Sequence, residues 1–216
     1  MKMRLLLATA ALVLFASYAK ADAIPYPNAG TPITTNTDVY ASGNAISFAY
    51  FYGFNAADTD YLEIYDVTKG AFLTVSGGGT EFFVNQSTPV GTQISLFGAT
   101  SGDLLQLDVY NEATGQLLTS DPTKNTTTDP GDSNAYVTNY SGGVDGIPAG
   151  VFVGEEDLSS KSSPKSDYDY NDDQYVLTDV HIAPEPSSLL LLGTGLLGLA
   201  FVAFRKAKAP GAVLSM

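Results

Sequence analysis

The sequence predicts an all-β protein: a single antiparallel β-sandwich, jelly-roll-like, flanked by an N-terminal signal peptide and a C-terminal transmembrane helix. No stretch between residues 23 and 182 has the apolar period of an amphipathic helix. Short runs rich in Tyr, Phe, Val, Ile and Thr occur instead, separated by Gly, Pro, Asn and Asp. Eight Phe and twelve Tyr fall within residues 22–182, which is enough aromatic volume to fill a sandwich core without tryptophan.

A secretory signal peptide is predicted at residues 1–21. Two basic residues open the chain, and an apolar run, Leu5–Ala16, follows them. Small-x-small cleavage sites end at Ala21 and at Ala23, and the sequence does not decide between them. The run is too short to span a bilayer, so we expect export and cleavage.

A short N-terminal segment, residues 22–45, precedes the predicted sandwich at residues 46–182. Ten short strands with turn signals between them favour two antiparallel sheets over an alternation of strands and helices. The predicted strands are Ile46–Phe54, Tyr61–Val67, Ala71–Val75, Glu81–Asn85, Gln93–Phe97, Leu104–Tyr110, Gln116–Ser120, Ala135–Asn139, Gly150–Gly154 and Tyr175–His181.

Charge and composition exclude several classes of function. Residues 22–182 hold 22 of the 23 acidic residues and only four basic ones, so nucleic acid is not an expected partner. The chain has no cysteine, which excludes disulfides, thiolate metal sites and thiol nucleophiles. Its one histidine, His181, makes a histidine base or a two-histidine metal site unexpected.

The C-terminal region carries the second apolar run. Residues 189–204 are sixteen uncharged and mostly apolar positions, followed at once by Arg205 and Lys206. As a helix they would rise about 24 Å, slightly less than a hydrocarbon core of about 30 Å. We predict a transmembrane helix over 189–204, with the basic residues as its cytoplasmic stop and residues 209–216 as a tail.

The motif Pro184-Glu185-Pro186 stands just before this run. Two prolines around a glutamate keep the backbone extended and accessible. Together with the glycine-containing apolar helix and the Arg205-Lys206 pair, residues 183–208 resemble the bacterial PEP-CTERM sorting signal. The resemblance implies an exported protein of a Gram-negative envelope, anchored transiently in the inner membrane, processed by an exosortase-type sorting enzyme and associated with extracellular polysaccharide and biofilm. It implies a cellular destination and a processing event, but no enzymatic activity.

An acidic cluster is the strongest candidate site in the middle of the chain. Asp167, Asp169 and Asn171 are spaced two residues apart, and a curled backbone would aim their oxygens at one point, as in loops that bind Ca²⁺. It is not an EF-hand, because Asp172 stands where that loop needs glycine and Thr178 where it needs glutamate. If residues 167–173 were instead an extended strand, the acids would share one face and repel one another without a cation. The alternative is a solvated acidic loop without metal.

A second family resemblance rests on the stretch Val153-Gly-Glu-Glu-Asp-Leu158, the polar loop after it and the Asp-x-Asp-Tyr-Asn-Asp run at 167–172. This region resembles the family called domain of unknown function 4114. Two departures are a glutamate at 155, where that family has phenylalanine, and a serine- and lysine-rich linker in place of a glycine-rich one. The family's acids have been interpreted as calcium ligands or as enzymic groups. The resemblance gives as candidate ligands of Ca²⁺ the residues Glu156, Asp157, Asp167, Asp169, Asn171 and Asp172.

Three interpretations of function follow. The first is a non-catalytic, Ca²⁺-stabilised sandwich of the cell surface or extracellular matrix. The second is a polysaccharide hydrolase that uses two of the carboxylates as acid and base. The third is a structural surface protein without metal. Acids that share one ion would all stay ionised, whereas acid–base catalysis needs their pKa values to differ, so we expect no enzyme and predict no catalytic residue.

Overall fold

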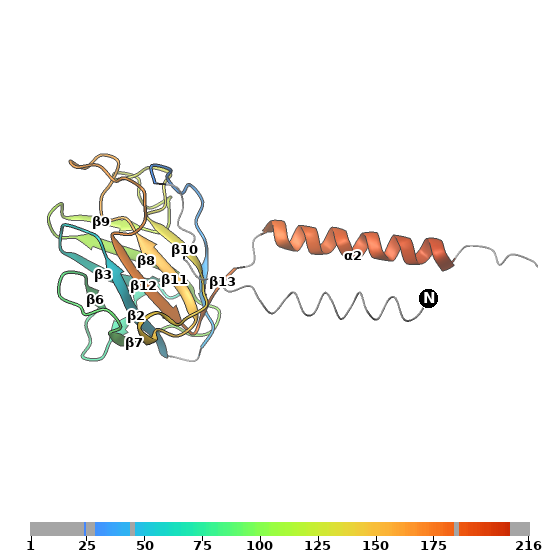
Figure 1. Cartoon of the computed structure of the whole chain (residues 1–216), viewed down its shortest axis with the longest axis horizontal. Coiled ribbons are helices and arrows are strands. Elements are labelled where there is room, and N and C mark those ends of the chain that lie inside the picture. Colours follow the sequence, from blue (N-terminus) through green and yellow to red (C-terminus); the bar gives the residue numbers. More distant parts are fainter. Residues whose placement is uncertain (1–23, 25–28, 44–45, 184–185, 208–216) are drawn as a thin grey trace, which may run out of the picture. The chain divides into compact units, whose positions relative to one another are not determined.

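The computed structural model describes residue 24 and residues 29–43, 46–183 and 186–207. By their internal contacts the residues divide into two units, 1–182 and 183–216. The described part of the first unit forms two antiparallel β-sheets (Figure 1), so the predicted all-β class is confirmed. The predicted signal peptide at 1–21 and both of its cleavage sites lie outside the described residues.

Seven strands form the first sheet and six form the second. The first sheet has the order β13-β1-β8-β3-β4, with β6 beside β3 and β9 beside β8. Its strands are β1 (Val39–Ala41), β3 (Asp60–Asp66), β4 (Ala71–Phe72), β6 (Phe83–Val84), β8 (Leu104–Asn111), β9 (Gln116–Thr119) and β13 (Val180–Ile182). The second sheet, in spatial order, consists of β10 (Ala135–Tyr140), β11 (Gly150–Glu155), β12 (Asp173–Thr178), β2 (Ile46–Phe54), β7 (Gln93–Phe97) and β5 (Thr74–Val75).

Two predicted strands are split between the sheets. The predicted strand Ala71–Val75 becomes β4 in the first sheet and β5 in the second, because the chain crosses the sandwich edge at the buried Leu73. The predicted strand Tyr175–His181 becomes β12 and β13, separated by Asp179, whose φ of 57° is left-handed. Neither break has a glycine or proline to signal it, since Leu73 and Asp179 interrupt otherwise β-favouring runs.

Strand β1 lies within residues 22–45, where no strand was expected. It pairs with β8 on one side and with β13 on the other. A run of only three residues is too short to show an alternating pattern in the sequence. The pairing nevertheless ties this segment into the first sheet.

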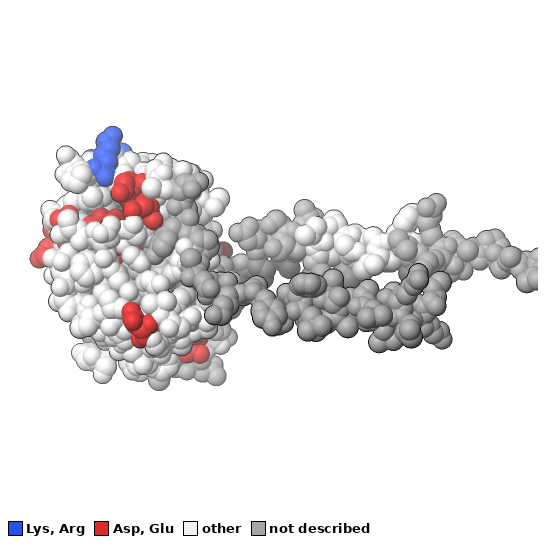
Figure 2. All heavy atoms as spheres, in the orientation of Figure 1, with Lys and Arg blue, Asp and Glu red and all other residues white. Residues whose placement is uncertain are grey.

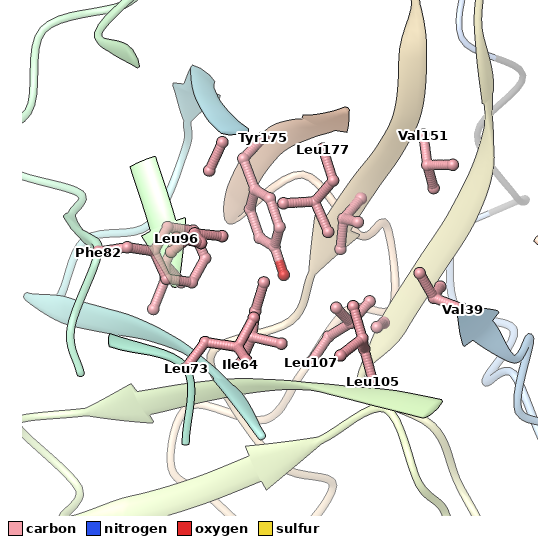
Figure 3. Packing of buried hydrophobic residues seen from close by; sticks show 14 of the residues in the cluster. Val39, Ile64, Leu73, Phe82, Leu96, Leu105, Leu107, Val151, Tyr175 and Leu177 are labelled. Carbon is pink, nitrogen blue, oxygen red and sulfur yellow. The ribbon is translucent and has the colours of Figure 1, made fainter. Parts of the chain in front are cut away.

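The core lies between the two sheets. Inward side chains alternate with outward ones, as in β3, where buried and half-buried positions follow one another through all seven residues. Figure 3 shows the two layers facing each other, with Tyr175, Leu177, Val151 and Leu96 from the second sheet and Ile64, Leu105, Leu107 and Val39 from the first. Tyr175 is fully buried in this core.

The second unit contains the helix α2 (Pro186–Ala207). The predicted helix therefore forms, and its apolar side chains at 191–201 are exposed, with Leu191 75% and Leu197 71% exposed. The transmembrane prediction for 189–204 is not supported: within the described residues no helix is both long and apolar enough to cross a membrane. Its run of sixteen uncharged, mostly apolar residues falls short of the roughly 20 that a span needs.

Candidate metal centre

The six predicted ligands all lie in the loop of residues 156–172, which joins β11 to β12. β11 ends at Glu155, and β12 begins at its cross-strand partner Asp173. The two ends of the loop are therefore adjacent, and the acids gather at one end of the second sheet. Of the two backbone alternatives, the extended strand over 167–173 is not adopted, because β12 begins only at Asp173.

The backbone at 167–171 is curled. Tyr168 and Tyr170 have φ values of 52° and 55°, which places both in the left-handed region that residues with a β-carbon rarely adopt. The buried side chain of Tyr170 anchors this conformation: its hydroxyl accepts the N–H of Ile33 at 2.7 Å and lies 3.3 Å from the carbonyl of Ser133. The loop is thereby fixed to the N-terminal segment.

Glu156 organises the loop from inside. Its carboxylate is fully buried and accepts hydrogen bonds from the Ser166 hydroxyl, from the Tyr168 N–H at 3.1 Å and from the Tyr170 N–H. Carboxylate oxygens of Glu156, Asp167 and Asp169 lie within 4.8 Å of one another. Oxygens at such separations can share one hard cation.

Asn171 completes this set. Its side-chain N–H donates to Asp169, and its backbone N–H donates to the other oxygen of the same carboxylate at 3.2 Å. The amide oxygen of Asn171 is buried and accepts no hydrogen bond. We call Glu156, Asp167, Asp169 and Asn171 the loop group; it offers three carboxylates, from buried to exposed, and one amide oxygen that accepts no hydrogen bond.

Asp157 and Asp172, the other two predicted ligands, belong to a second set. The Asp157 N–H donates to the Asp172 carboxylate at 3.3 Å, and the Asp157 carboxylate accepts the side-chain N–H of Asn111 at 3.2 Å. These contacts direct both residues toward the space between the sheets. With Asp60 and Asp173 they form what we call the interior group: Asp60, Asp157, Asp172 and Asp173.

Asp60 and Asp173 face each other from opposite sheets. Asp60 begins β3 and lies on its inward face with Leu62 and Ile64. Asp173 begins β12 and lies on its inward face with Tyr175. Both are completely buried. The Asp60 carboxylate accepts the side-chain N–H of Asn85 at 2.6 Å, and Asn85 in turn accepts the Asp60 N–H at 3.0 Å.

Burial and mutual repulsion raise the pKa values of these acids. Burial first, and neighbouring carboxylates second, raise the pKa of Asp157 to about 7 and that of Asp172 to about 8. Burial, only partly offset by the hydrogen bond from Asn85, raises the pKa of Asp60 to about 7. The pKa of Asp173 is raised well above its ordinary value by burial and by the charge of Asp60.

The loop group shows the same effect more weakly. Burial and the charge of Asp172 raise the pKa of Glu156 to about 7, against the three donors that favour its ionised form. Burial also raises the pKa of Asp169. A divalent cation at either group would reverse this balance, because it stabilises the ionised carboxylates that bind it.

The sequence signalled the interior group only indirectly. An acid at the inward phase of a strand, as Asp60 and Asp173 are, breaks the apolar alternation and could have marked a buried site. The strands of Asp60 and Asp173 are separated by more than a hundred residues, and only the sandwich brings them together. Few of the acids reach the face shown in Figure 2, where the domain surface is mostly uncharged.

The sorting residues lie in the second unit. Pro184 and Glu185 fall outside the described residues, Pro186 begins α2, and Arg205 and Lys206 lie in its last turn. The chain is thus an antiparallel β-sandwich with buried acids, followed by a short helical tail. Residues 183–206 match the PEP-CTERM protein-sorting motif. This motif implies an exported protein that is anchored to a membrane before an exosortase cleaves it.

No family match supports the resemblance of the sandwich to domain of unknown function 4114. Neither a curated protein nor a solved structure matches the chain. What the sandwich does must therefore be argued from its own residues.

Proposed function

We propose that this protein is a non-catalytic β-sandwich of the cell surface or extracellular matrix, exported, processed by an exosortase, and stabilised by Ca²⁺ at the loop group. The observation that carries the proposal is the convergence of Glu156, Asp167 and Asp169 within 4.8 Å in a domain that precedes a PEP-CTERM motif. The proposed location is a Gram-negative cell envelope, and the proposed partner is the exopolysaccharide of the biofilm.

The loop group fits Ca²⁺ in donor type. Its oxygens come from three carboxylates and one amide, which are ligands that Ca²⁺ prefers, and Asp167 is exposed, so an ion can enter and retain water. The unused amide oxygen of Asn171 gives a further ligand at no cost in hydrogen bonds. Magnesium fits less well, because it demands a tight octahedron at about 2.0–2.1 Å.

A hydrolase is the second candidate, and burial argues against it. A polysaccharide chain must reach both catalytic carboxylates, yet Glu156 and Asp157 are at most 3% exposed. One hollow on the described surface has no acid in its lining, which consists of Thr34, Pro122, Thr123, Thr126, Pro130 and Gly131. A structural surface protein without metal is the remaining alternative.

Calcium binding by the full-length chain tests the proposal. Extracellular modules bind Ca²⁺ with Kd values of about 10⁻⁴–10⁻³ M, so titration to about 10 mM is required. At a hundredfold excess over Kd one bound ion stabilises the fold by about 2.7 kcal/mol, which raises Tm by on the order of 5–10 °C for a domain of this size.

Asp169→Asn should remove one bound Ca²⁺ and the part of the Tm increase that this ion produces. The variant should still fold, because the unused oxygen of Asn171 can accept a hydrogen bond from the new amide. Glu112→Gln, at an exposed position, is the matched control and should bind as the wild type does. Equal numbers of bound ions in wild type and Asp169→Asn would refute the loop site.

A further inference from the structure

No basic residue in the described part of the chain forms an ion pair with the interior group. In the described part of the chain the ion pairs are those of Lys69, which lies 2.6 Å from Asp103 and 3.6 Å from Asp66. Lys161 donates to the carbonyl of Thr127 instead. The four carboxylates lie close enough to repel one another between the sheets, and no basic residue of the described chain neutralises them, which is unfavourable while they are ionised.

The interior group contains buried carboxylate oxygens that have no hydrogen-bond partner. Both carboxylate oxygens of Asp173 and the Oδ1 atom of Asp60 are buried and accept no hydrogen bond. The side chains of Asp60 and Asp173 are in contact, yet two ionised carboxylates cannot bond to each other, since neither has a hydrogen to donate. Buried acceptors are almost always satisfied in native proteins, so these three atoms call for a bound cation or for protons.

The surrounding amides hold the carboxylates in position without occupying them. Asn85 and Asn111 direct their side-chain N–H groups at Asp60 and Asp157, while their amide oxygens accept backbone N–H groups of Gln86 and Thr114. Asn85 donates to the Oδ2 atom of Asp60 and leaves its Oδ1 atom without a hydrogen bond. Such second contacts are the usual support of oxygen ligands around a metal.

We propose that the interior group binds a second divalent cation of the Ca²⁺ class, held by Asp60 and Asp173 from the two opposite sheets together with Asp157 and Asp172. This ion is distinct from the one at the loop group, although the charges of Asp172 and Glu156 act on each other. It joins β3 to β12 across the core, so that it fastens the two sheets at the end from which the 156–172 loop emerges. Asp172 is half-buried, which gives the ion a way in from solvent.

Isothermal titration of the full-length chain with CaCl₂, after chelator treatment and dialysis, tests this proposal. The wild type should bind two Ca²⁺ per chain, Asp169→Asn one, Asp173→Asn one, and the double variant none. Asp173→Asn removes a charge and keeps the shape of the side chain, so the ion-free variant should melt no lower than the ion-free wild type. Glu112→Gln again serves as the control.

The titration can refute either of the two proposed sites without refuting the other. An Asp173→Asn variant that binds as many ions as the wild type overturns the interior site, whatever Asp169→Asn does. A wild type that binds a single ion, lost in Asp173→Asn and kept in Asp169→Asn, supports the interior site and refutes the loop site. If Asp173→Asn does not fold, Asp60→Asn takes its place, and a full complement of Ca²⁺ in that variant likewise overturns the proposal.

Discussion

Gly154 of β11 and Tyr170 of the 156–172 loop are in such close backbone contact that no side chain fits between them. A β-carbon on Gly154 would lie 2.2 Å from the carbonyl oxygen of Tyr170. The same tyrosine donates its backbone N–H to Glu156 and is anchored through its hydroxyl to Ile33. The position of the loop group is therefore set by a glycine on the neighbouring strand.

Gly154→Ala should destabilise the domain and weaken the loop site. Relieving a contact with rigid backbone moves the loop or the strand, and such overpacking typically costs about 1–3 kcal/mol. Urea unfolding measures the loss of stability, and calcium titration measures the loss of affinity. Gly53→Ala, in β2 of the same sheet, is the control, because its β-carbon meets no atom within 4 Å and should cost little. Equal stability of the two variants would contradict this account.

Most of the strands could be predicted from the sequence, because alternation and turn residues act locally. The bounds of β2 and β7 are those predicted, and most others differ by one or two residues. The places where the chain changes sheets, at Leu73 and Asp179, could not be predicted, since each depends on which strand lies alongside in the folded state.

The acidic site could be predicted only where it is local. Residues 167–171 are close in sequence, and their curled conformation was one of two stated alternatives. The division of the predicted ligands into two groups could not be foreseen, because Asp157 and Asp172 take their positions from Asn111 and from the opposite sheet. Long-range pairing decides which carboxylates meet.

Glu185→Ala should block processing and leave the sandwich unchanged. Glu185 lies in the segment matched by the PEP-CTERM motif, which belongs to a different unit from the sandwich. In a host with an exosortase, cell fractionation should find the variant in the membrane as the uncleaved precursor, with the Tm of the wild type. Glu112→Ala should be released normally. Release of Glu185→Ala at the wild-type rate would show that the motif is not used.

Asp108 gives a pH dependence at a carboxyl that belongs to neither candidate metal group. It lies on β8, 1% exposed, and burial raises its pKa to about 7. The groups that act on it most are Gln106, which donates to both of its oxygens at 2.8 and 3.0 Å, and the charges of Glu63, Asp121 and Lys124. The charge of Asp108 in turn raises the pKa of the buried Glu155. Raising the pH through this window therefore ionises a buried carboxyl that Lys124 only partly compensates.

The direction of the effect follows from proton linkage. An unfolded chain releases the Asp108 proton near its ordinary pKa of about 3.9, whereas the folded chain keeps it up to about pH 7. The folded state thus binds more protons between these values, and the stability that this proton gives is complete below about pH 4 and is lost as the pH rises through 7. Over about three pKa units the loss amounts to at most about 4 kcal/mol.

Asp108→Asn should remove this loss. The new amide can accept from Gln106 and donate to the Gln106 Oε1 atom, which is buried without a partner in the wild type. The difference in free energy of unfolding between variant and wild type, measured by urea denaturation at fixed calcium, should be smallest near pH 4 and largest above pH 7, with the variant more stable. Contributions of acids that do not interact with Asp108 cancel in that difference, and Glu112→Gln should show none of it. A difference that is constant from pH 4 to pH 8 would mean that Asp108 is ionised throughout, and that its burial is offset by a partner other than Gln106.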